Sequence, residues 1–264
     1  MGTPHAAGVT VRDFMSRNVL TVDAHSNVNK TIDLMAEHNV GSVVILDSGG
    51  PKGIFTERDL LSKVLTRGKR PDTTLIREVV SPLFADVGPS ESLEQAAKKM
   101  VSKKSRLMVF EGKDLTGIVT ATDLVRIIHG LGQTFDISKV VTKKVVAVGH
   151  DTTVEWTVQE MDAKRIGSVI VNKEGKPWGI FTERDLLVKI LAPRMRMGTP
   201  VGAVATSPLT TAPLGIDGKD AAGIMVSDRI KRLPLTEGEN IRGIVTARDL
   251  VEAFAAPTVE RDVR

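Results

Sequence analysis

The sequence predicts a mixed α/β fold of the α+β class, built from four copies of one β-α-β-β-α unit. The stretch Gly-Ile-Phe-Thr-Glu-Arg-Asp-Leu-Leu occurs at 53–61 and returns unchanged at 179–187. A looser copy, Gly-Ile-Val-Thr-Ala-x-Asp-Leu-Val, lies at 117–125 and at 243–251. The first glycines of these copies are spaced by 64, 62 and 64 residues. A fixed period of this kind is the signature of a repeat architecture.

Composition narrows the class of protein. With 41% hydrophobic and 26% charged residues, the chain is typical of soluble globular domains. The absence of Cys excludes disulfides and a thiol nucleophile. No apolar run is long enough to span a bilayer, and the first ten residues lack the features of a signal peptide. We therefore expect a cytoplasmic protein without a membrane partner.

Local patterns place the elements of the first unit. Leu60, Leu61, Val64 and Leu65 recur at helical spacing after a short β-favouring run, so a strand is expected to lead into a closing helix. An Asp-Ser-Gly-Gly turn at 47–50 separates two strands. The expected order is a lead-in helix, a strand, a helix, two strands and the closing helix, at 9–16, 19–22, 27–38, 43–46, 52–55 and 57–66.

The second unit repeats this order at 75–80, 83–87, 92–102, 106–110, 115–119 and 122–128, and a Gly-containing linker follows at 130–133. The third unit is expected at 145–148, 154–164, 169–172, 178–181 and 183–191, and the fourth at 209–212, 219–227, 232–235, 241–245 and 247–254. The helix at 219–227 is the weakest, because Gly215, Gly218 and Gly223 each weaken it. The unit boundaries are placed at 1–70, 71–133, 134–196 and 197–264.

The pattern Gly-hydrophobic-x-Thr-x-x-Asp, closing a unit of roughly 60 residues, resembles the CBS domain, the family named after cystathionine β-synthase. The resemblance implies that consecutive motifs pair into two Bateman modules, 1–133 and 134–264. It also implies that the modules stack into a disk with pseudo-two-fold symmetry, as a monomer or a homodimer. Adenosine ligands are expected in clefts between paired motifs.

The Thr-x-x-Asp signature supports two interpretations. It matches a capping box, in which Thr caps a helix and Asp bonds back. A helix N-terminus also suits phosphate, and an acidic residue one turn later suits a ribose diol. The family resemblance assigns ribose binding to Asp59, Asp123, Asp185 and Asp249, and contacts near phosphate or ribose to Thr56, Thr120, Thr182 and Thr246.

Other cleft residues follow from the same resemblance. The first strands of motifs one and three are expected to line clefts through Thr21 and Val22, and through Val146 and Ala147; the third motif lacks the usual polar residue. Arg106 and Arg232 begin the second strands of motifs two and four, where a basic residue reaches phosphate in nucleotide-sensing relatives. Motifs one and three carry Gly-Ser there. The better-equipped clefts are therefore expected to use Arg106, Thr120 and Asp123 with Thr21, and Arg232, Thr246 and Asp249 with the first strand of motif three. Arg58, Arg184 and Arg248 either add phosphate contacts or form surface ion pairs.

We expect a regulatory sensor of AMP, ADP or ATP that acts on an unidentified regulated protein. Three alternatives remain: a scaffold in which Thr and Asp only cap helices, a nucleic-acid-binding protein, and a sensor of S-adenosylmethionine. Nucleic acid is compatible with the net charge of +4, and S-adenosylmethionine is disfavoured by Arg-rich clefts. The five His residues show no metal-ligand spacing and no phosphate-binding P-loop occurs, so no enzyme, catalytic residue, metal or catalytic cofactor is expected.

Overall fold

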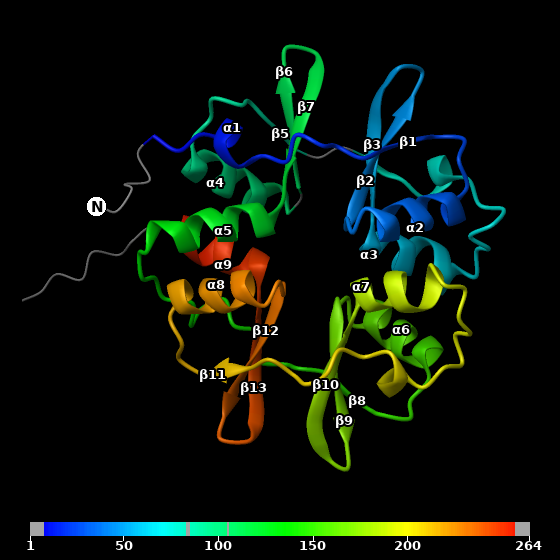
Figure 1. Ribbon diagram of the computed structural model, residues 1–264, viewed down its shortest axis with the longest axis vertical. Coiled ribbons are helices and arrows are strands. Elements are labelled where there is room, and N and C mark those ends of the chain that lie inside the picture. Colours follow the sequence, from blue (N-terminus) through cyan, green and yellow to red (C-terminus); the bar gives the residue numbers. More distant parts are fainter. Residues whose placement is uncertain (1–7, 83–84, 105, 257–264) are drawn as a thin grey trace, which may run out of the picture. The chain divides into compact units, whose positions relative to one another are not determined.

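The computed structural model describes residues 8–82, 85–104 and 106–256 (Figure 1). Contacts group the chain into two compact units. The odd unit, Val19–Leu83 with Val145–Thr210, holds motifs one and three. The even unit, Met1–Asn18 with Phe84–Lys144 and Thr211–Arg264, holds motifs two and four. The modules expected at 1–133 and 134–264 pair consecutive motifs instead, and that pairing stays a prediction.

Each motif of the odd unit has the expected order of elements. Motif one contains β1 (Thr21–Asp23), α2 (Val28–Glu37), β2 (Ser42–Asp47), β3 (Gly50–Thr56) and α3 (Glu57–Asp59). Motif three contains β8 (Ala147–Gly149), α6 (Val154–Ala163), β9 (Ser168–Lys173), β10 (Lys176–Thr182) and α7 (Glu183–Asp185). In both motifs the first strand runs parallel to the second, and the second and third form an antiparallel hairpin.

The closing helices of the odd unit change their winding after one turn. α3 continues as a π-helix, η1 (Leu60–Val64), and then as a 3₁₀-helix, η2 (Leu65–Arg67). α7 likewise continues as a π-helix, η4 (Leu186–Leu191). The Ala192 N–H bonds the carbonyl of Leu187, five residues earlier, as π winding requires. The sequence predicted ordinary helices at 57–66 and 183–191, and their position is confirmed but their winding is not.

The even unit keeps regular α-helices in the same places. Motif two contains β5 (Asp86–Val87), α4 (Leu93–Lys103), β6 (Leu107–Glu111), β7 (Asp114–Val119) and α5 (Ala121–Leu131). Motif four contains β11 (Ala212–Pro213), α8 (Gly218–Ser227), β12 (Arg232–Glu237), β13 (Asn240–Thr246) and α9 (Ala247–Ala255). Residues 83–84 of the strand expected at 83–87 lie outside the described residues.

The doubtful helix of motif four forms because it is well capped and tightly packed. The Asp217 carboxylate accepts hydrogen bonds from the N–H groups of Lys219 and Asp220. A Cβ on Gly218 would lie 2.2 Å from the Phe135 ring, so glycine allows a close contact that offsets its low helix propensity.

The lead-in segments of motifs one and two are exchanged: each packs on the other motif and not on the motif that it precedes. The lead-in segments of motifs three and four are exchanged in the same way. α1 (Val11–Phe14) lies on motif two, where the Val11 N–H bonds the Glu91 carbonyl. The lead-in of motif two, η3 (Ile76–Glu78) and β4 (Ser81–Pro82), lies on motif one, where β4 pairs with β3. Likewise Thr142 bridges Ile244 in motif four, and Thr206 bridges Ile180 in motif three, next to η5 (Val201–Ala203).

This exchange explains why the repeated stretch in the third strand of each motif begins with glycine. A Cβ on Gly53 would lie 2.3 Å from the Ser81 carbonyl oxygen, and one on Gly179 would lie 2.7 Å from that of Thr206. In the even unit, a Cβ on Gly117 would lie 2.7 Å from Met15 Sδ. A Cβ on Gly243 would lie 2.4 Å from Val141 Cγ1. Glycine therefore lets the exchanged segment cross the third strand at close range.

The cores of the two units are built differently. In the even unit one cluster joins both motifs, with α4, α5, α8 and α9 packed together (Figure 1). In the odd unit two clusters exchange one leucine each: Leu187 of motif three packs in the core of motif one, and Leu61 of motif one packs in the core of motif three. Within the described ranges, no helix is long and apolar enough to cross a membrane.

Candidate functional site

All four Thr-x-x-Asp signatures form the same hydrogen-bonded box. In each, one carboxylate oxygen of Asp, Oδ2, accepts from the Thr backbone N–H and from the Thr hydroxyl, at 2.6–3.0 Å. The boxes are Thr56 with Asp59, Thr120 with Asp123, Thr182 with Asp185, and Thr246 with Asp249. The capping interpretation therefore describes the geometry of all four motifs. It uses one carboxylate oxygen and leaves Oδ1 for another role.

In motif one the second oxygen is also occupied. Asp59 Oδ1 accepts from the Ser81 hydroxyl at 2.6 Å and forms an ion pair with Lys63 Nζ at 2.9 Å. Lys63 Nζ also donates to Ser81 Oγ at 2.6 Å. Only 5% of Asp59 is exposed. Since a carboxylate offers about four acceptor positions, these partners fill it.

Motif three repeats this arrangement. Asp185 Oδ1 accepts from the Thr206 hydroxyl at 2.9 Å and pairs with Lys189 Nζ at 2.7 Å. Lys189 Nζ also donates to Thr206 Oγ1 and to the Val204 carbonyl. All three ammonium hydrogens therefore have a partner, and Asp185 is as buried as Asp59.

In motifs two and four the described residues form no hydrogen bond to the second oxygen, and we call this oxygen open. Asp123 is buried, and its Oδ1 pairs with Arg126 Nη1 at 3.6 Å through an Arg126 side chain that is 62% exposed. That distance is too long for a hydrogen bond. For Asp249, no partner beyond Thr246 occurs in the described part of the chain. Burial raises the pKa of Asp249 above 3.8, and the hydrogen bonds from Thr246 offset this effect in part.

The residue opposite the box differs between the two kinds of motif. Cross-strand pairing places Ser42 opposite Thr56, Ser168 opposite Thr182, and Arg232 opposite Thr246. Leu107 pairs with Val119, so the same register places Arg106 opposite Thr120. In motifs two and four an Arg therefore lies at the end of the sheet where the Thr-Asp box begins.

Two of the predicted phosphate ligands form ion pairs, and their contact with phosphate stays a prediction. Arg58 Nε lies 2.7 Å from Glu183 Oε1, and Arg184 Nε lies 3.1 Å from Glu57 Oε1. Arg184 also donates to the carbonyl oxygens of Asn39 and Val40. These reciprocal pairs join motifs one and three inside the odd unit. The ion-pair alternative thus accounts for Arg58 and Arg184, whereas Arg248 is exposed on α9.

The lead-in hydroxyls escaped the sequence reasoning. Ser16, Ser81, Thr142 and Thr206 occupy equivalent places, with spacings of 65, 61 and 64 residues. Their period follows that of the repeat, which was the available signal. Each lies before the first strand of one motif but contacts another motif, so neighbouring sequence did not reveal its role.

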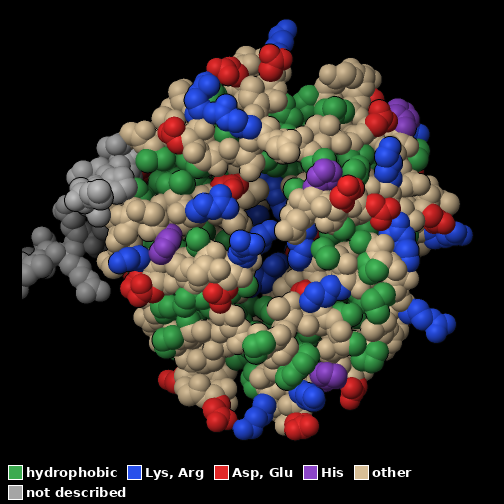
Figure 2. Space-filling view, viewed as in Figure 1, with side chains coloured by type: hydrophobic (Ala, Val, Ile, Leu, Met, Phe, Trp, Pro, Cys, Tyr) green, Lys and Arg blue, Asp and Glu red, His purple; other side chains and the backbone are tan. Residues whose placement is uncertain are grey.

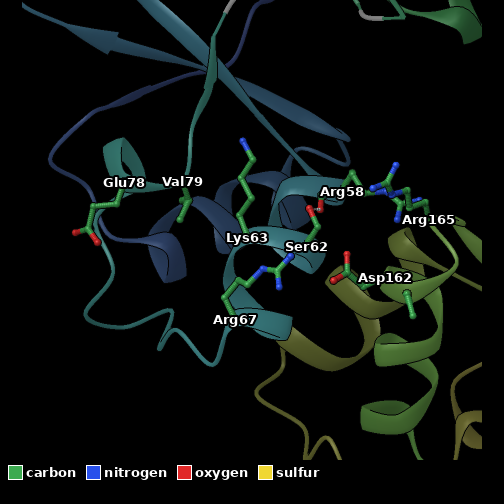
Figure 3. A pocket seen from close by; sticks show the side chains of 9 residues that line it. Arg58, Ser62, Lys63, Arg67, Glu78, Val79, Asp162 and Arg165 are labelled. Atoms are coloured by element: carbon green, nitrogen blue, oxygen red, sulfur yellow. Dashed lines mark hydrogen bonds between the residues drawn. The ribbon is translucent and has the colours of Figure 1, made fainter.

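Two open pockets lie in the odd unit. One, of about 750 Å³, is lined by Arg58, Ser62, Lys63, Arg67, Glu78, Val79, Asp162, Ala163 and Arg165. In Figure 3, Arg58 and Arg165 lie together at one end, with the Asp162 carboxylate below them. Thr66 donates to Asp162 at 2.8 Å. Acidic and basic groups are thus mixed around this pocket.

The second pocket, of about 490 Å³, contains one of the predicted cleft residues. It is lined by Ala147, Val148, Gly149, Thr152, Thr153 and Trp156. Trp156 is 49% exposed and supplies an aromatic face beside Ala147. Val146 precedes this strand, while Thr21 and Val22 lie in β1 on the equivalent strand of motif one. These four residues belong to the odd unit, and their role in ligand binding stays a prediction.

The described residues contain no group of three or more His or acidic side chains placed to hold an ion. Over the outer surface in Figure 2, Lys and Arg alternate with Asp and Glu.

Comparison with known proteins agrees with the repeat. The CBS domain family matches at residues 11–66, 76–130, 137–192 and 201–256. The chain belongs to the CBS domain family. The family assignment and the fold class expected from the Gly-h-x-Thr-x-x-Asp pattern are therefore confirmed.

Three similar proteins illustrate the range of the family. The uncharacterized protein MJ1404 of Methanocaldococcus jannaschii is 24% identical over 93% of this chain and 62% of its own length. Inosine-5'-monophosphate dehydrogenase of the same organism is 31% identical over 51% of this chain and 27% of its own length. The crystal structure of MJ1225, also from that organism, matches with a TM-score of 0.77 at 17% identity, covering 93% of this chain and 100% of that one. The chain spans less than two thirds of the length of the first curated relatives, between 62% and 65%.

Proposed function

We propose that this tandem CBS protein is a regulatory sensor of adenine nucleotides, with ribose sites at Asp123 and Asp249. One observation carries the proposal: in motifs two and four, an open carboxylate oxygen lies at the same sheet end as Arg106 or Arg232. A ribose diol needs hydrogen-bond acceptors, and a phosphate needs donors and positive charge. Both needs meet at this sheet end.

The helices support the phosphate part of the proposal. α5 and α9 begin at the residue after Thr120 and Thr246, and both are regular helices of 11 and 9 residues. In α9 the Ala247 N–H already donates to the Lys231 carbonyl and the Asp249 N–H to Thr246 Oγ1, so the support comes from the positive end of the helix dipole. The Arg opposite each Thr adds charge that distinguishes AMP, ADP and ATP by the number of phosphates.

The relatives are consistent with a regulatory role. MJ1225 is described as a proposed archaeal homologue of the γ subunit of AMPK, and inosine-5'-monophosphate dehydrogenase acts on a nucleotide. The chain passes from each lead-in segment, packed on one motif of a consecutive pair, directly into the other motif, and on this connectivity we propose the modules 1–133 and 134–264. A nucleotide would act on its regulated partner protein only through unequal affinity for two conformations.

Calorimetric titration of the ligand-free full chain with AMP, ATP and S-adenosylmethionine tests the proposal. We expect saturable binding of AMP or ATP, with Asp123→Asn and Asp249→Asn each removing one site. Asn keeps the size of the side chain and changes its acceptor. Asp114→Asn, at the exposed first residue of β7, is the matched control and should bind as the unsubstituted chain does.

A scaffold without ligand is the second candidate, and the capping boxes favour it specifically. In that case the titrations are flat, and Asp123→Asn lowers the free energy of unfolding without any effect on binding. Flat titrations with all three ligands would therefore contradict the sensor.

A further inference from the structure

The residue four positions after the motif aspartate separates the four motifs into two pairs. In motifs one and three it is a lysine, Lys63 or Lys189, which lies in the π-helical turn and pairs with the carboxylate. In motifs two and four the same position holds Ile127 and Ala253 on regular helices. The lead-in hydroxyl is present in all four motifs, so it does not explain the difference.

We infer that Lys63 and Lys189 are specificity-determining residues that close motifs one and three to nucleotides, so that the chain has two ribose sites rather than four. The inference rests on the proposed function. In motif one, three hydrogen bonds and the ion pair with Lys63 fill the acceptor positions of Asp59. A ribose diol approaching this carboxylate has no acceptor left to bind.

Displacing the lysine is unfavourable for two reasons. Asp59 and Asp185 are each 5% exposed, and removing the cation would leave a buried carboxylate without a counter-charge. The lysines are also held by other partners, since Lys63 donates to Ser81 and Lys189 donates to Thr206 and Val204. A ribose hydroxyl is neutral and cannot replace the charge of the ammonium.

The arginines expected near a phosphate also differ in motifs one and three. The residue opposite Thr56 and Thr182 is a serine, so these motifs lack the arginine that faces the box in motif four. Arg58 and Arg184 are held by Glu183 and Glu57. The charged groups of motifs one and three thus form ion pairs within the odd unit, and Lys63 and Lys189 belong to this set.

Grafting the lysine onto an open motif tests the inference directly. Ala253→Lys places an ammonium four residues after Asp249, and Ala253→Gln is the matched control of similar length without the charge. We expect equilibrium dialysis with AMP or ATP to give two bound nucleotides for the unsubstituted chain and for Ala253→Gln. For Ala253→Lys we expect one, with affinity at motif four reduced about tenfold or more. Asp59→Asn and Asp185→Asn should leave both nucleotides bound.

The outcomes separate the two claims. If the unsubstituted chain binds no nucleotide, the proposed function is wrong. If it binds but Ala253→Lys and Ala253→Gln bind equally, or if Asp59→Asn removes a site, the sensor stands and the role of the lysines is wrong. Unfolding midpoints of both Ala253 variants show whether a lost site reflects a lost fold.

Discussion

The closing helices of motifs one and three and those of motifs two and four start from the same Thr-x-x-Asp box and then diverge. In the odd unit, α3 and α7 change to π winding after one turn, and a lysine in the π-helical segment forms an ion pair with the carboxylate of the box. In the even unit, α5 and α9 stay regular, and the carboxylate keeps an open oxygen. A shared signature therefore does not fix the partners of the aspartate: a lysine four positions after it pairs with the carboxylate in motifs one and three.

The largest effect is expected at the glycines that the lead-in segments cross. Gly53→Ala in the odd unit puts a methyl group 2.3 Å from a backbone oxygen of Ser81, which cannot move without breaking the pairing of β3 with β4. Gly117→Ala in the even unit meets the sulfur of Met15, at the end of a flexible side chain. We expect a loss of about 2–3 kcal/mol in the free energy of unfolding for Gly53→Ala and about 1 kcal/mol for Gly117→Ala.

Urea denaturation followed by circular dichroism measures both losses. Gly50→Ala is the control, because nothing lies within 4 Å of its Cβ position. Equal losses for Gly53→Ala and Gly117→Ala would show that the exchanged segments are held with the same rigidity in both units.

A smaller contrast is expected between the cations beside the motif aspartates. Lys63→Met leaves Asp59 buried without its ion pair, while Arg126→Met removes an exposed side chain 3.6 Å from Asp123. We expect Lys63→Met to cost about 1–2 kcal/mol in the free energy of unfolding, and Arg126→Met to cost close to nothing. Thermal unfolding of the two variants beside the unsubstituted chain measures the difference. A loss at Arg126 as large as that at Lys63 would mean that both kinds of motif depend on their cation.

Much of this comparison could be predicted from the sequence, because the period and the Thr-x-x-Asp signature are local. They placed the strands, the helices and the four boxes. The grouping of motifs two and four as better-equipped sites also followed from Arg106 and Arg232, and it stays a prediction. The partners of Asp59 could not be predicted, because Ser81 lies 22 residues away and reaches it only through the exchange of lead-in segments. The partner of Arg58 is Glu183, in another motif, so no local pattern signals it.

The smallest expected effect is the pH dependence of the free energy of unfolding that comes from Asp249, in motif four. Burial raises the pKa of Asp249 in the folded chain above the ordinary value of 3.8 for an aspartate. At pH values between 3.8 and the raised pKa, Asp249 is therefore protonated more often in the folded state than in the unfolded state. Stability from this group falls as pH rises through that window, because burial and the charge of Glu252 disfavour the ionised carboxylate more than Thr246 and Arg248 favour it.

The sign of this effect can be measured by subtracting two curves. The free energy of unfolding of the unsubstituted chain, minus that of Asp249→Asn, should fall as pH rises through the window and stay level above it. Ligand binding should show the opposite trend, because a protonated Asp249 offers a ribose diol a weaker acceptor. Nucleotide affinity at motif four is thus expected to drop as pH falls through the same window. If the affinity at motif four stays constant there while the stability difference changes, Asp249 titrates as expected but does not hold the ribose.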